Sequence, residues 1–256
     1  MSEESHLAQN TLDTVVVRGL AKDEQGHAMV LQFARTPPDG QNPLVWGTRP
    51  DALPEMPKRP PSSLPPPAHA TLDIVIADEL GSGRVGCVYS VQTARCSVSD
   101  HVPPLVVKIT NRDRRDELCK EAWVYEEMEC LQGPASRAAT GILLLERVGD
   151  KLPLGEPVPQ VLQDDLWGII RDLAELGIGH HDLRYDNLLM APRSPPGLPS
   201  TPSPYSGRSY GLRVIDFDYA YKYNMPKDRL SASSSSFVDL VLDNVPEGRI
   251  VNIFDE

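Results

Sequence analysis

The sequence has few cysteines, few basic residues and no long hydrophobic run. Its 256 residues include four cysteines, none of which forms a CxxC pair, so the spacing of a structural metal site is absent. No apolar run approaches the ~18 residues of a membrane-spanning helix, and the polar start MSEESHLAQN contains no secretory signal pattern. We therefore expect a soluble intracellular protein, cytoplasmic or nuclear, with reduced thiols and no membrane partner.

The charge balance argues against a protein that coats nucleic acid. Lys and Arg number 25 against 36 Asp and Glu, which gives a formal net charge of -11. Binding along a phosphate backbone requires a basic surplus. We therefore expect no nucleic-acid partner, and the length suits one or two domains with a substantial core.

Proline is abundant and clustered, and it suggests where the domains begin and end. The chain has 25 prolines, roughly twice the average usage, of which eleven lie between 37 and 67 and six between 192 and 204. Such segments favour extended backbone and offer few residues to bury. The predicted organisation is an N-terminal extension (1–35), a Pro-rich linker (36–70), a folded domain (71–225) with a Pro/Ser-rich insertion (191–210), and a C-terminal tail (226–256). Within the insertion, we expect 192–207 to be mobile and to lie outside the core.

Hydrophobic patterning predicts two helices and several short strands, of which the first two strands lie in the N-terminal extension and the others in the folded domain. Apolar residues recur at spacings of three and four in both helical segments, whereas the strands are short apolar runs next to turn residues. The predicted helices are 113–131 and 161–176. The predicted strands are 14–17, 28–33, 74–76, 88–91, 105–109, 142–145, 188–190 and 212–215.

A glycine motif lies between two of these strands, with Gly81, Gly83 and Gly86 followed by Val88. Glycines at such a turn let backbone amides approach phosphate oxygens without a side chain in the way. The strand that follows argues against a dinucleotide-binding fold, in which a helix would follow. Alone, the motif is equally consistent with an ordinary glycine-rich hairpin turn.

Charged residues on the following strand and helix suggest an ion pair. Lys108 ends an apolar run and needs an anionic partner if it is buried. Glu121 shares the apolar face of the next helix and could orient Lys108 toward phosphates. Glu117, one turn earlier on the same face, is an alternative partner.

Polar residues after the second helix form the strongest cluster. Asp182 and Asn187 lie five residues apart in a loop, where one suits acceptance of a substrate proton and the other a divalent cation. Arg184 between them could neutralise a transferring phosphoryl group. Asp216 ends an apolar strand, a suitable position for a magnesium ligand.

The order of these motifs resembles the protein-kinase signature set over about residues 72–223, some 60% of the chain. The phrases KEAWVYEEM, ILLLERVGDKL, GHHDLRYDNLL and VIDFDYA are similar to short fungal kinase-like proteins. The resemblance implies an α+β, two-lobed fold with a β-rich upper lobe and a reduced helical lower lobe. It also implies ATP and Mg²⁺ as cofactors and a protein Ser or Thr hydroxyl as acceptor.

The resemblance further assigns roles to individual residues. Lys108 would contact the α- and β-phosphates and pair with Glu121, below the loop of Gly81, Gly83, Gly86 and Val88. Leu145 would stand behind the adenine, and backbone groups of Glu146 and Val148 would bind its edge. Asp182 would be the catalytic base, Arg184 would replace the family's lysine, and Asn187 and Asp216 would hold magnesium.

The chain departs from the kinase pattern at several points. His181 stands where the family has arginine, and Asp218 where it has glycine. Only 24 residues separate Glu121 from Leu145, and 38 follow Asp218 without an A-P-E sequence. A small-molecule kinase of the aminoglycoside or choline type and a pseudokinase binding module therefore stay open as alternatives. The sequence leaves the substrate and the oligomeric state undetermined.

Overall fold

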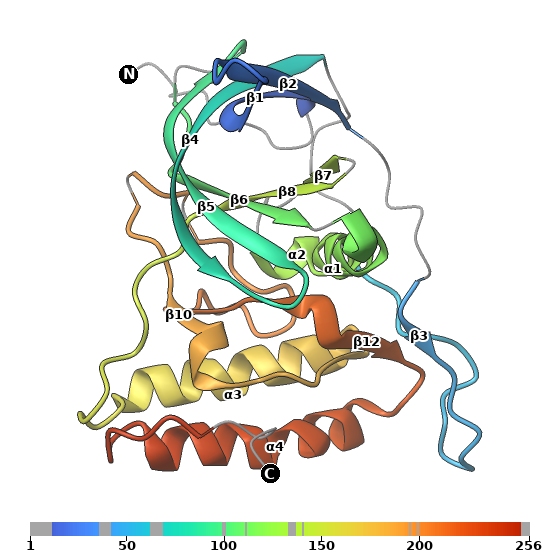
Figure 1. Cartoon of the computed structure of the whole chain (residues 1–256). Helices are drawn as coiled ribbons and strands as arrows, with labels where there is room; N and C mark the ends of the chain where they lie inside the picture. Colours follow the sequence, from blue (N-terminus) through green and yellow to red (C-terminus); the bar gives the residue numbers. More distant parts are fainter. Residues whose placement is uncertain are drawn as a thin grey trace, which may run out of the picture.

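The chain forms a mixed α+β structure in which a curled seven-stranded sheet lies on one side of a set of helices and two small sheets (Figure 1). The α+β class expected from the sequence is confirmed. Parts of the predicted extension, linker and tail, at 1–11, 36–41, 62–68 and 252–256, lie outside the described residues. The computed structural model describes residues 12–35, 42–61, 69–98, 101–110, 112–132, 137–139, 141–194, 196–198 and 200–251.

The large sheet has the strand order β2-β1-β4-β5-β6-β8-β7, and only β1 and β4 pair in parallel. Alternate residues of β4, from Ala70 to Ile76, are buried, as the two-residue period of a half-buried strand requires. Because β1 and β2 join this sheet, the predicted N-terminal extension continues the domain expected to begin at residue 71. The strands are β1 (Leu12–Lys22), β2 (Ala28–Ala34), β4 (Ala70–Ser82), β5 (Gly86–Cys96), β6 (Leu105–Thr110), β7 (Arg137–Ala139) and β8 (Ile142–Glu146).

Helix α1 (Arg115–Glu127) lies next to the sheet and covers most of the first predicted helix. Its residues Leu118, Ala122 and Tyr125 are buried at spacings of four and three, as the apolar pattern predicts. The short α2 (Glu129–Gln132) follows after a break at Met128. Helix α1 carries the buried Glu121, whose carboxylate meets Lys108 of the sheet.

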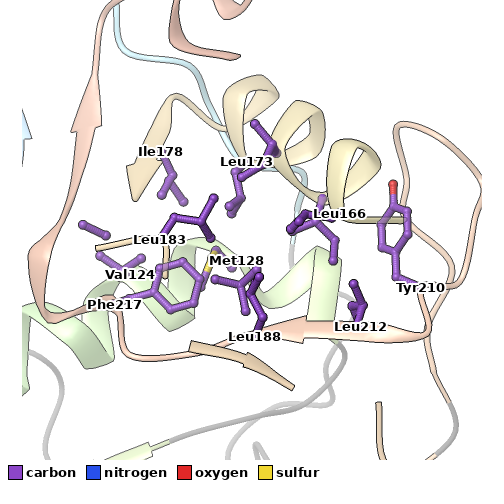
Figure 2. Packing of buried hydrophobic residues seen from close by; sticks show 14 of the residues in the cluster. Val124, Met128, Leu166, Leu173, Ile178, Leu183, Leu188, Tyr210, Leu212 and Phe217 are labelled. Atoms are coloured by element: carbon purple, nitrogen blue, oxygen red, sulfur yellow. The ribbon is translucent and has the colours of Figure 1, made fainter. Parts of the chain in front are cut away.

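Two longer helices, α3 (Gln160–Glu175) and α4 (Lys227–Asn244), pack against each other in the other half of the chain. Side chains from α3, including Leu166 and Leu173, pack with Leu183, Leu188 and Phe217 in one buried cluster (Figure 2). Helix α3 confirms the second predicted helix, whereas α4 lies in the predicted tail. No helix among the described residues is long and apolar enough to cross a membrane.

Two small sheets lie beside these helices. One pairs β10 with β11 and the other has the order β3-β12-β9. Each of these strands has only two to four residues. Their bounds are β3 (Leu44–Val45), β9 (Ile178–His180), β10 (Leu188–Met190), β11 (Leu212–Val214) and β12 (Ala220–Tyr223).

The described part of the predicted Pro-rich linker, residues 42–61, is bound to the helical half rather than extended away from it. The Leu53 N–H donates to the Asn224 carbonyl at 2.7 Å, and the Asn224 amide donates back to Leu53 at 2.9 Å. Asp51 forms an ion pair with Arg229 of α4 at 2.6 Å. This segment is thus the long crossover that a parallel β1–β4 pair requires.

Most described residues of 192–207, which we expected outside the core, are exposed, although Leu198 is buried; the end of the insertion, at 208–210, packs against α3. Tyr210 is buried and its hydroxyl donates to Asp172 of α3 at 2.6 Å. Arg208 donates to Asp165 of the same helix at 2.8 Å. Both carboxylates are buried, so they require polar partners, and the insertion supplies them.

Candidate functional site

The glycine motif forms the hairpin between β4 and β5. At Gly86 a Cβ would lie 1.9 Å from the Ile109 carbonyl oxygen, so only glycine fits against β6. At Gly81 and Gly83 a Cβ would meet no heavy atom within 4 Å. The Gly83 N–H donates to the Gly86 carbonyl at 2.8 Å and closes the turn. The glycines therefore have two different functions, close strand packing at Gly86 and open backbone at the tip.

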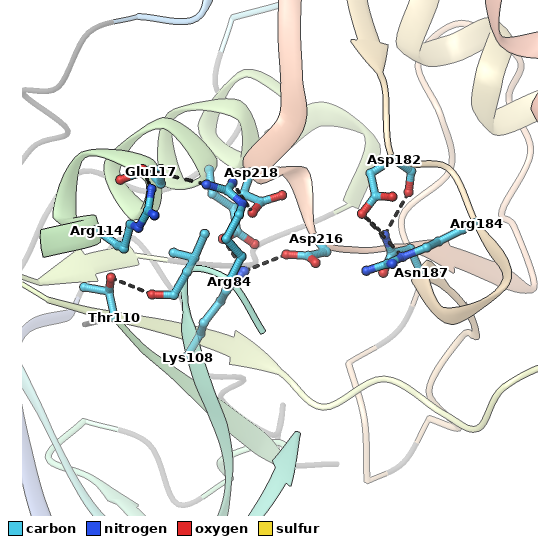
Figure 3. Close-up of polar contacts among 12 residues, drawn as sticks. Arg84, Lys108, Thr110, Arg114, Glu117, Asp182, Arg184, Asn187, Asp216 and Asp218 are labelled. Carbon is cyan, nitrogen blue, oxygen red and sulfur yellow. Dashed lines mark hydrogen bonds and ion pairs between the residues drawn. The ribbon is translucent and has the colours of Figure 1, made fainter. Parts of the chain in front are cut away.

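Lys108 lies on β6 opposite Val88 and is buried between two carboxylates. Its Nζ donates to Glu121 Oε2 at 2.7 Å and to Asp216 Oδ1 at 2.6 Å (Figure 3). Glu117, the alternative partner, contacts arginines instead. The structure therefore resolves the alternative in favour of Glu121. We call Lys108, Glu121 and Asp216 the Lys108 cluster.

Burial and neighbouring charges shift the pKa values of Lys108 and Glu121 in opposite directions. Burial lowers the pKa of the Lys108 ammonium, but the carboxylates of Glu121 and Asp216 outweigh it, so that this pKa is raised. Burial raises the pKa of the Glu121 carboxyl, and the charge of Lys108 opposes that rise. Lys108 is therefore a fixed cation, held by carboxylates that come from two different elements.

Asp216 has an unusual backbone conformation. Its φ of 63° and ψ of 66° place it in the left-handed region, and no other non-glycine residue of the described chain has a positive φ. Such a conformation costs on the order of 1–3 kcal/mol and is found most often at active sites and ligand clamps. Asp216 follows β11 and precedes the short helix η4 (Phe217–Tyr219). The backbone thus turns sharply at the residue that contacts Lys108.

The loop over residues 180–187, here called the Asp182 loop, brings together three of the predicted residues. The Asn187 amide donates to the Asp182 carbonyl at 2.8 Å and to its carboxylate at 3.2 Å. Arg184 Nε lies 3.4 Å from Asp182 Oδ2. Asp216 lies between this loop and Lys108 in Figure 3. The predicted residues of the loop and of the Lys108 cluster therefore belong to one site.

His180 joins the Asp182 loop to the strand that ends at Asp216. The Asp182 N–H donates to His180 Nδ1 at 3.2 Å, so Nε2 carries the proton and donates to the Ile215 carbonyl at 3.0 Å. Ile215 in turn donates its N–H to the Asn187 carbonyl at 3.0 Å. Burial lowers the pKa of His180 to about 4. The neutral imidazole is therefore the form that makes both hydrogen bonds.

Three buried polar atoms of this site have no hydrogen-bond partner among the described residues: Asp182 Oδ1, Arg184 Nε and Asp218 Oδ1. Arg184 Nε is near Asp182 Oδ2, but the geometry is not that of a hydrogen bond. Burial raises the pKa of the Asp182 carboxyl, with Asp216 adding to the rise and Arg184 opposing it. Unpartnered buried polar atoms are uncommon in folded proteins. They indicate a site shaped for a polar ligand.

The donors present fit a magnesium ion held partly by its substrate. In the described part of the chain, no group of three or more His, Cys, Asp or Glu side chains has the arrangement of a metal site. Magnesium, however, is commonly bound by one or two protein oxygens together with substrate phosphates and water. Asp216 offers a carboxylate, and Asn187 directs its amide nitrogen to Asp182, which leaves the amide oxygen on the opposite side. These two oxygens suit a shared cation and do not make a site for a permanently bound metal.

The residues expected near an adenine lie at the end of β8. Leu145 pairs with Val106 of β6, and Glu146 is the last residue of the strand. The Glu146 carboxylate accepts the N–H of Leu198 at 2.6 Å, and burial raises its pKa. Val148 follows on the segment that leads toward α3. The insertion thus contacts this segment as well as α3.

Sequence reasoning missed Arg84, which lies at the tip of the glycine hairpin. It forms an ion pair with Asp218 at 2.8 Å, although 134 residues separate the two. The signal in the sequence was a single arginine inside the glycine motif together with an aspartate where the resemblance implies glycine. Neither feature alone indicates that the two residues meet.

A scan against models of known protein families gives no match, and a search of curated proteins gives none either. The function must therefore be inferred from the geometry and chemistry of the site.

Proposed function

We propose that the chain is an ATP- and magnesium-dependent phosphotransferase of protein-kinase-like, two-lobed fold that acts on Ser or Thr hydroxyls of proteins. The observation that supports this most strongly is the placement of the Lys108 cluster next to the Asp182 loop. Phosphoryl transfer requires a fixed cation, a cation ligand and a group that orients the acceptor hydroxyl. Lys108, Asp216 and Asp182 provide these three groups.

In this proposal the nucleotide binds along the sheet side of the site. Lys108 binds the α- and β-phosphates, and its bond to Glu121 fixes its position. Backbone amides of the open hairpin tip at Gly81 and Gly83 approach the phosphate oxygens. The adenine lies near Leu145 and the backbone of Glu146 and Val148.

Asn187 and Asp216 would hold the cation, and Lys108 would exchange its contact with Asp216 for phosphate oxygens. Magnesium, when bound, supplies positive charge to the oxygens of the transferring phosphoryl group. The distance of 2.6 Å between Lys108 and Asp216 shows that both groups already meet. Nucleotide binding therefore rearranges contacts within a preformed site.

Asp182 orients the acceptor and takes its proton. As the hydroxyl oxygen forms its bond to the γ-phosphorus, the bond from that phosphorus to the bridging oxygen of ADP breaks. The hydroxyl proton moves to Asp182 Oδ1, the atom that has no partner within the described chain. Burial favours the proton-accepting step because it raises the pKa of this carboxyl. Arg184 neutralises charge on the transferring group.

A specific observation favours a second candidate, a small-molecule kinase. The exposed His181, next to Asp182, lies with its ring 5.8 Å from Tyr221 and 5.7 Å from Tyr223, and its Nε2 is 2.5 Å from the Tyr223 hydroxyl. Aromatic faces of this kind bind flat or cationic groups. A small acceptor such as an aminoglycoside or a choline-like alcohol could lie on them beside the catalytic base.

The test is transfer of labelled γ-phosphate from ATP with magnesium to generic protein substrates, and to aminoglycosides and choline in parallel. Asp182→Asn keeps the shape but removes the base, so transfer should fall about 10²- to 10⁴-fold while ATP affinity changes little. Asp186→Asn is the matched control, because the same substitution in the same loop removes an exposed ion pair with Lys151 and leaves the Asp182 carboxylate in place.

Each outcome separates one alternative from the others. Transfer to a small alcohol and not to proteins would replace the protein-kinase proposal with the second candidate. Binding of ATP without transfer to any acceptor would indicate a pseudokinase. Transfer that Asp182→Asn leaves intact would show that the base is misassigned.

A further inference from the structure

The glycine hairpin is connected to the opposite side of the site through the side chain at its tip. Arg84 Nη2 donates to Asp218 Oδ2 at 2.8 Å, and the Asp218 side chain is only 6% exposed. Asp218 lies two residues after Asp216 and follows the left-handed turn at that residue. The contact therefore spans from the hairpin to the segment that carries the predicted cation ligand (Figure 3).

Two further groups surround the same guanidinium. Its carbon lies 4.4 Å from the centroid of the Tyr219 ring, and Nη1 lies 3.8 Å from Glu117 Oε1 on α1. Glu117 is itself held by Arg114 at 2.9 Å. The Arg84 guanidinium thus contacts Asp218 and Tyr219 of one segment and Glu117 of α1.

The remainder of the hairpin tip has few side chains that could hold it in place. Gly81 and Gly83 contribute none, and a Cβ at either position would meet nothing within 4 Å. Val85 is buried, and its carbonyl accepts a hydrogen bond from Thr110 at 2.9 Å. Arg84 is therefore the polar group of the tip that reaches across the site.

We propose that Arg84 and Asp218 are positioning residues that hold the glycine hairpin closed over Lys108 and Asp216. Asp218 is buried, and its other oxygen has no partner in the described chain, so opening the hairpin removes its cation. Closure is thereby coupled to the ion pair between Arg84 and Asp218. This gives a reason for an aspartate at a position where glycine was expected from the resemblance.

The closed hairpin controls how fast ATP enters and leaves the site, an inference that rests on the proposed function. Because the ion pair must break before the hairpin can lift, it slows both entry and release of ATP. It also holds the backbone amides of the tip near the phosphates while the nucleotide is bound. Arg84 and Asp218 act through the hairpin and not on the reacting atoms.

The first test needs no nucleotide and therefore does not depend on the proposed function. Hydrogen exchange of the hairpin amides at 81–87 is measured in the wild type, Arg84→Gln, Asp218→Asn and the double variant. Each single variant should accelerate exchange about 10- to 100-fold, the effect expected when a hydrogen bond to a charged group is lost. The double variant should exchange no faster than the faster single variant, because both substitutions remove one interaction.

Arg114→Gln is the matched control, since Arg114 contacts Glu117 but not the hairpin. It should leave hairpin exchange unchanged, and Arg84→Lys should restore part of the protection. Unchanged exchange in Arg84→Gln, or an equal increase in Arg114→Gln, would overturn the proposal. So would fully additive effects of the two single substitutions.

The second test measures the rate of ATP release by stopped flow. Arg84→Gln should release nucleotide at least tenfold faster, and its KM for ATP should change more than its kcat. If hairpin exchange responds as expected but no nucleotide binds, the positioning pair stands and the proposed function fails. If nucleotide binds and Arg84→Gln changes neither exchange nor release, the positioning pair fails and the proposed function stands.

Discussion

The Lys108 cluster and the Asp182 loop differ in how their buried charges are compensated. Lys108 has a carboxylate on each of two sides, at 2.7 and 2.6 Å. In the Asp182 loop, Asp182 Oδ1 and Arg184 Nε are buried without a hydrogen-bond partner in the described residues. The first region is complete in the protein alone, whereas the second is arranged for an additional group. This contrast predicts that substitutions in the cluster lower stability as well as activity, whereas those in the loop lower activity with little loss of stability.

The largest effect on stability should come from Lys108→Met. Glu121 is 1% exposed and would be left as a buried carboxylate without its cation. Loss of one partner of a buried ion pair typically costs about 3–5 kcal/mol. We expect the free energy of unfolding, measured by urea titration, to decrease by roughly this amount. Lys108→Met/Glu121→Gln, which removes both charges, should recover most of the loss.

Arg184→Gln is the comparison in the Asp182 loop. Its side chain is about one-third exposed and lies 3.4 Å from Asp182, so the loss of unfolding free energy should be below about 1 kcal/mol. A loss as large as that of Lys108→Met would remove the contrast between the two regions.

Acid should break the connection between the two regions at His180. Its pKa is about 4 in the folded protein and 6.5 in the unfolded chain, so the unfolded state binds more protons between these values. The contribution of His180 to the free energy of unfolding is therefore fully present above pH 6.5 and is lost as the pH is lowered toward 4. The loss is at most about 1.4 kcal/mol per pH unit and roughly 3 kcal/mol in total.

The measurement is the free energy of unfolding against pH for the wild type and His180→Phe. The variant loses the hydrogen bonds to Asp182 and Ile215 but also the titrating group. Its curve should be flatter between pH 6.5 and 4. Parallel curves would show that His180 is not the group responsible.

A smaller effect is expected where the insertion pairs a buried carboxylate of α3. Tyr210→Phe removes the hydroxyl that donates to Asp172 at 2.6 Å. A hydrogen bond to a charged group contributes about 1.5–3 kcal/mol, so thermal unfolding should show a loss in that range without a loss of phosphotransfer. Ser209→Ala, at an exposed neighbouring position, should change little. If Tyr210→Phe and Ser209→Ala both had a negligible effect, the contact of the insertion with α3 would not contribute to stability.

Much of the fold was predictable where apolar runs alone define an element. The strands β6, β8 and β10 and helix α3 lie within one residue of their predicted bounds. Helix α4 was missed because five serines, four of them in the run 233–236, interrupt its apolar pattern. The hydroxyls of Ser233 and Ser235 donate hydrogen bonds to backbone carbonyls three residues earlier, at 2.7 and 2.8 Å, so the helix accommodates both serines.

The packing of the end of the insertion on α3 was not predicted, because the composition of the insertion gives no apolar signal. Its packing depends on Asp165 and Asp172, which lie seven residues apart on the buried face of α3. Two carboxylates on the apolar face of a helix need partners, and that was the signal in the sequence. The identity of the partners, Arg208 and Tyr210, follows only from the tertiary structure.

The candidate site was predictable to a similar extent. The pairing of Lys108 with Glu121 followed from helical spacing, although Glu117 was an equal alternative until the distances decided between them. The contact of Arg84 with Asp218 could not be predicted, because it joins residues 134 positions apart and depends on the turn at Asp216.

The most direct test of the central claim is whether ATP binds and whether magnesium acts through Asp216. Thermal melting is measured for the wild type and Asp216→Asn with ATP, with and without magnesium; asparagine suits this variant because it tolerates the left-handed backbone. In the wild type, ATP with magnesium at a hundredfold excess over Kd should stabilise the fold by roughly 2.7 kcal/mol, seen as a rise in Tm. In Asp216→Asn, the additional rise due to magnesium should disappear. No rise in the wild-type Tm with ATP, with or without magnesium, would contradict the proposed nucleotide site and the phosphotransferase function with it.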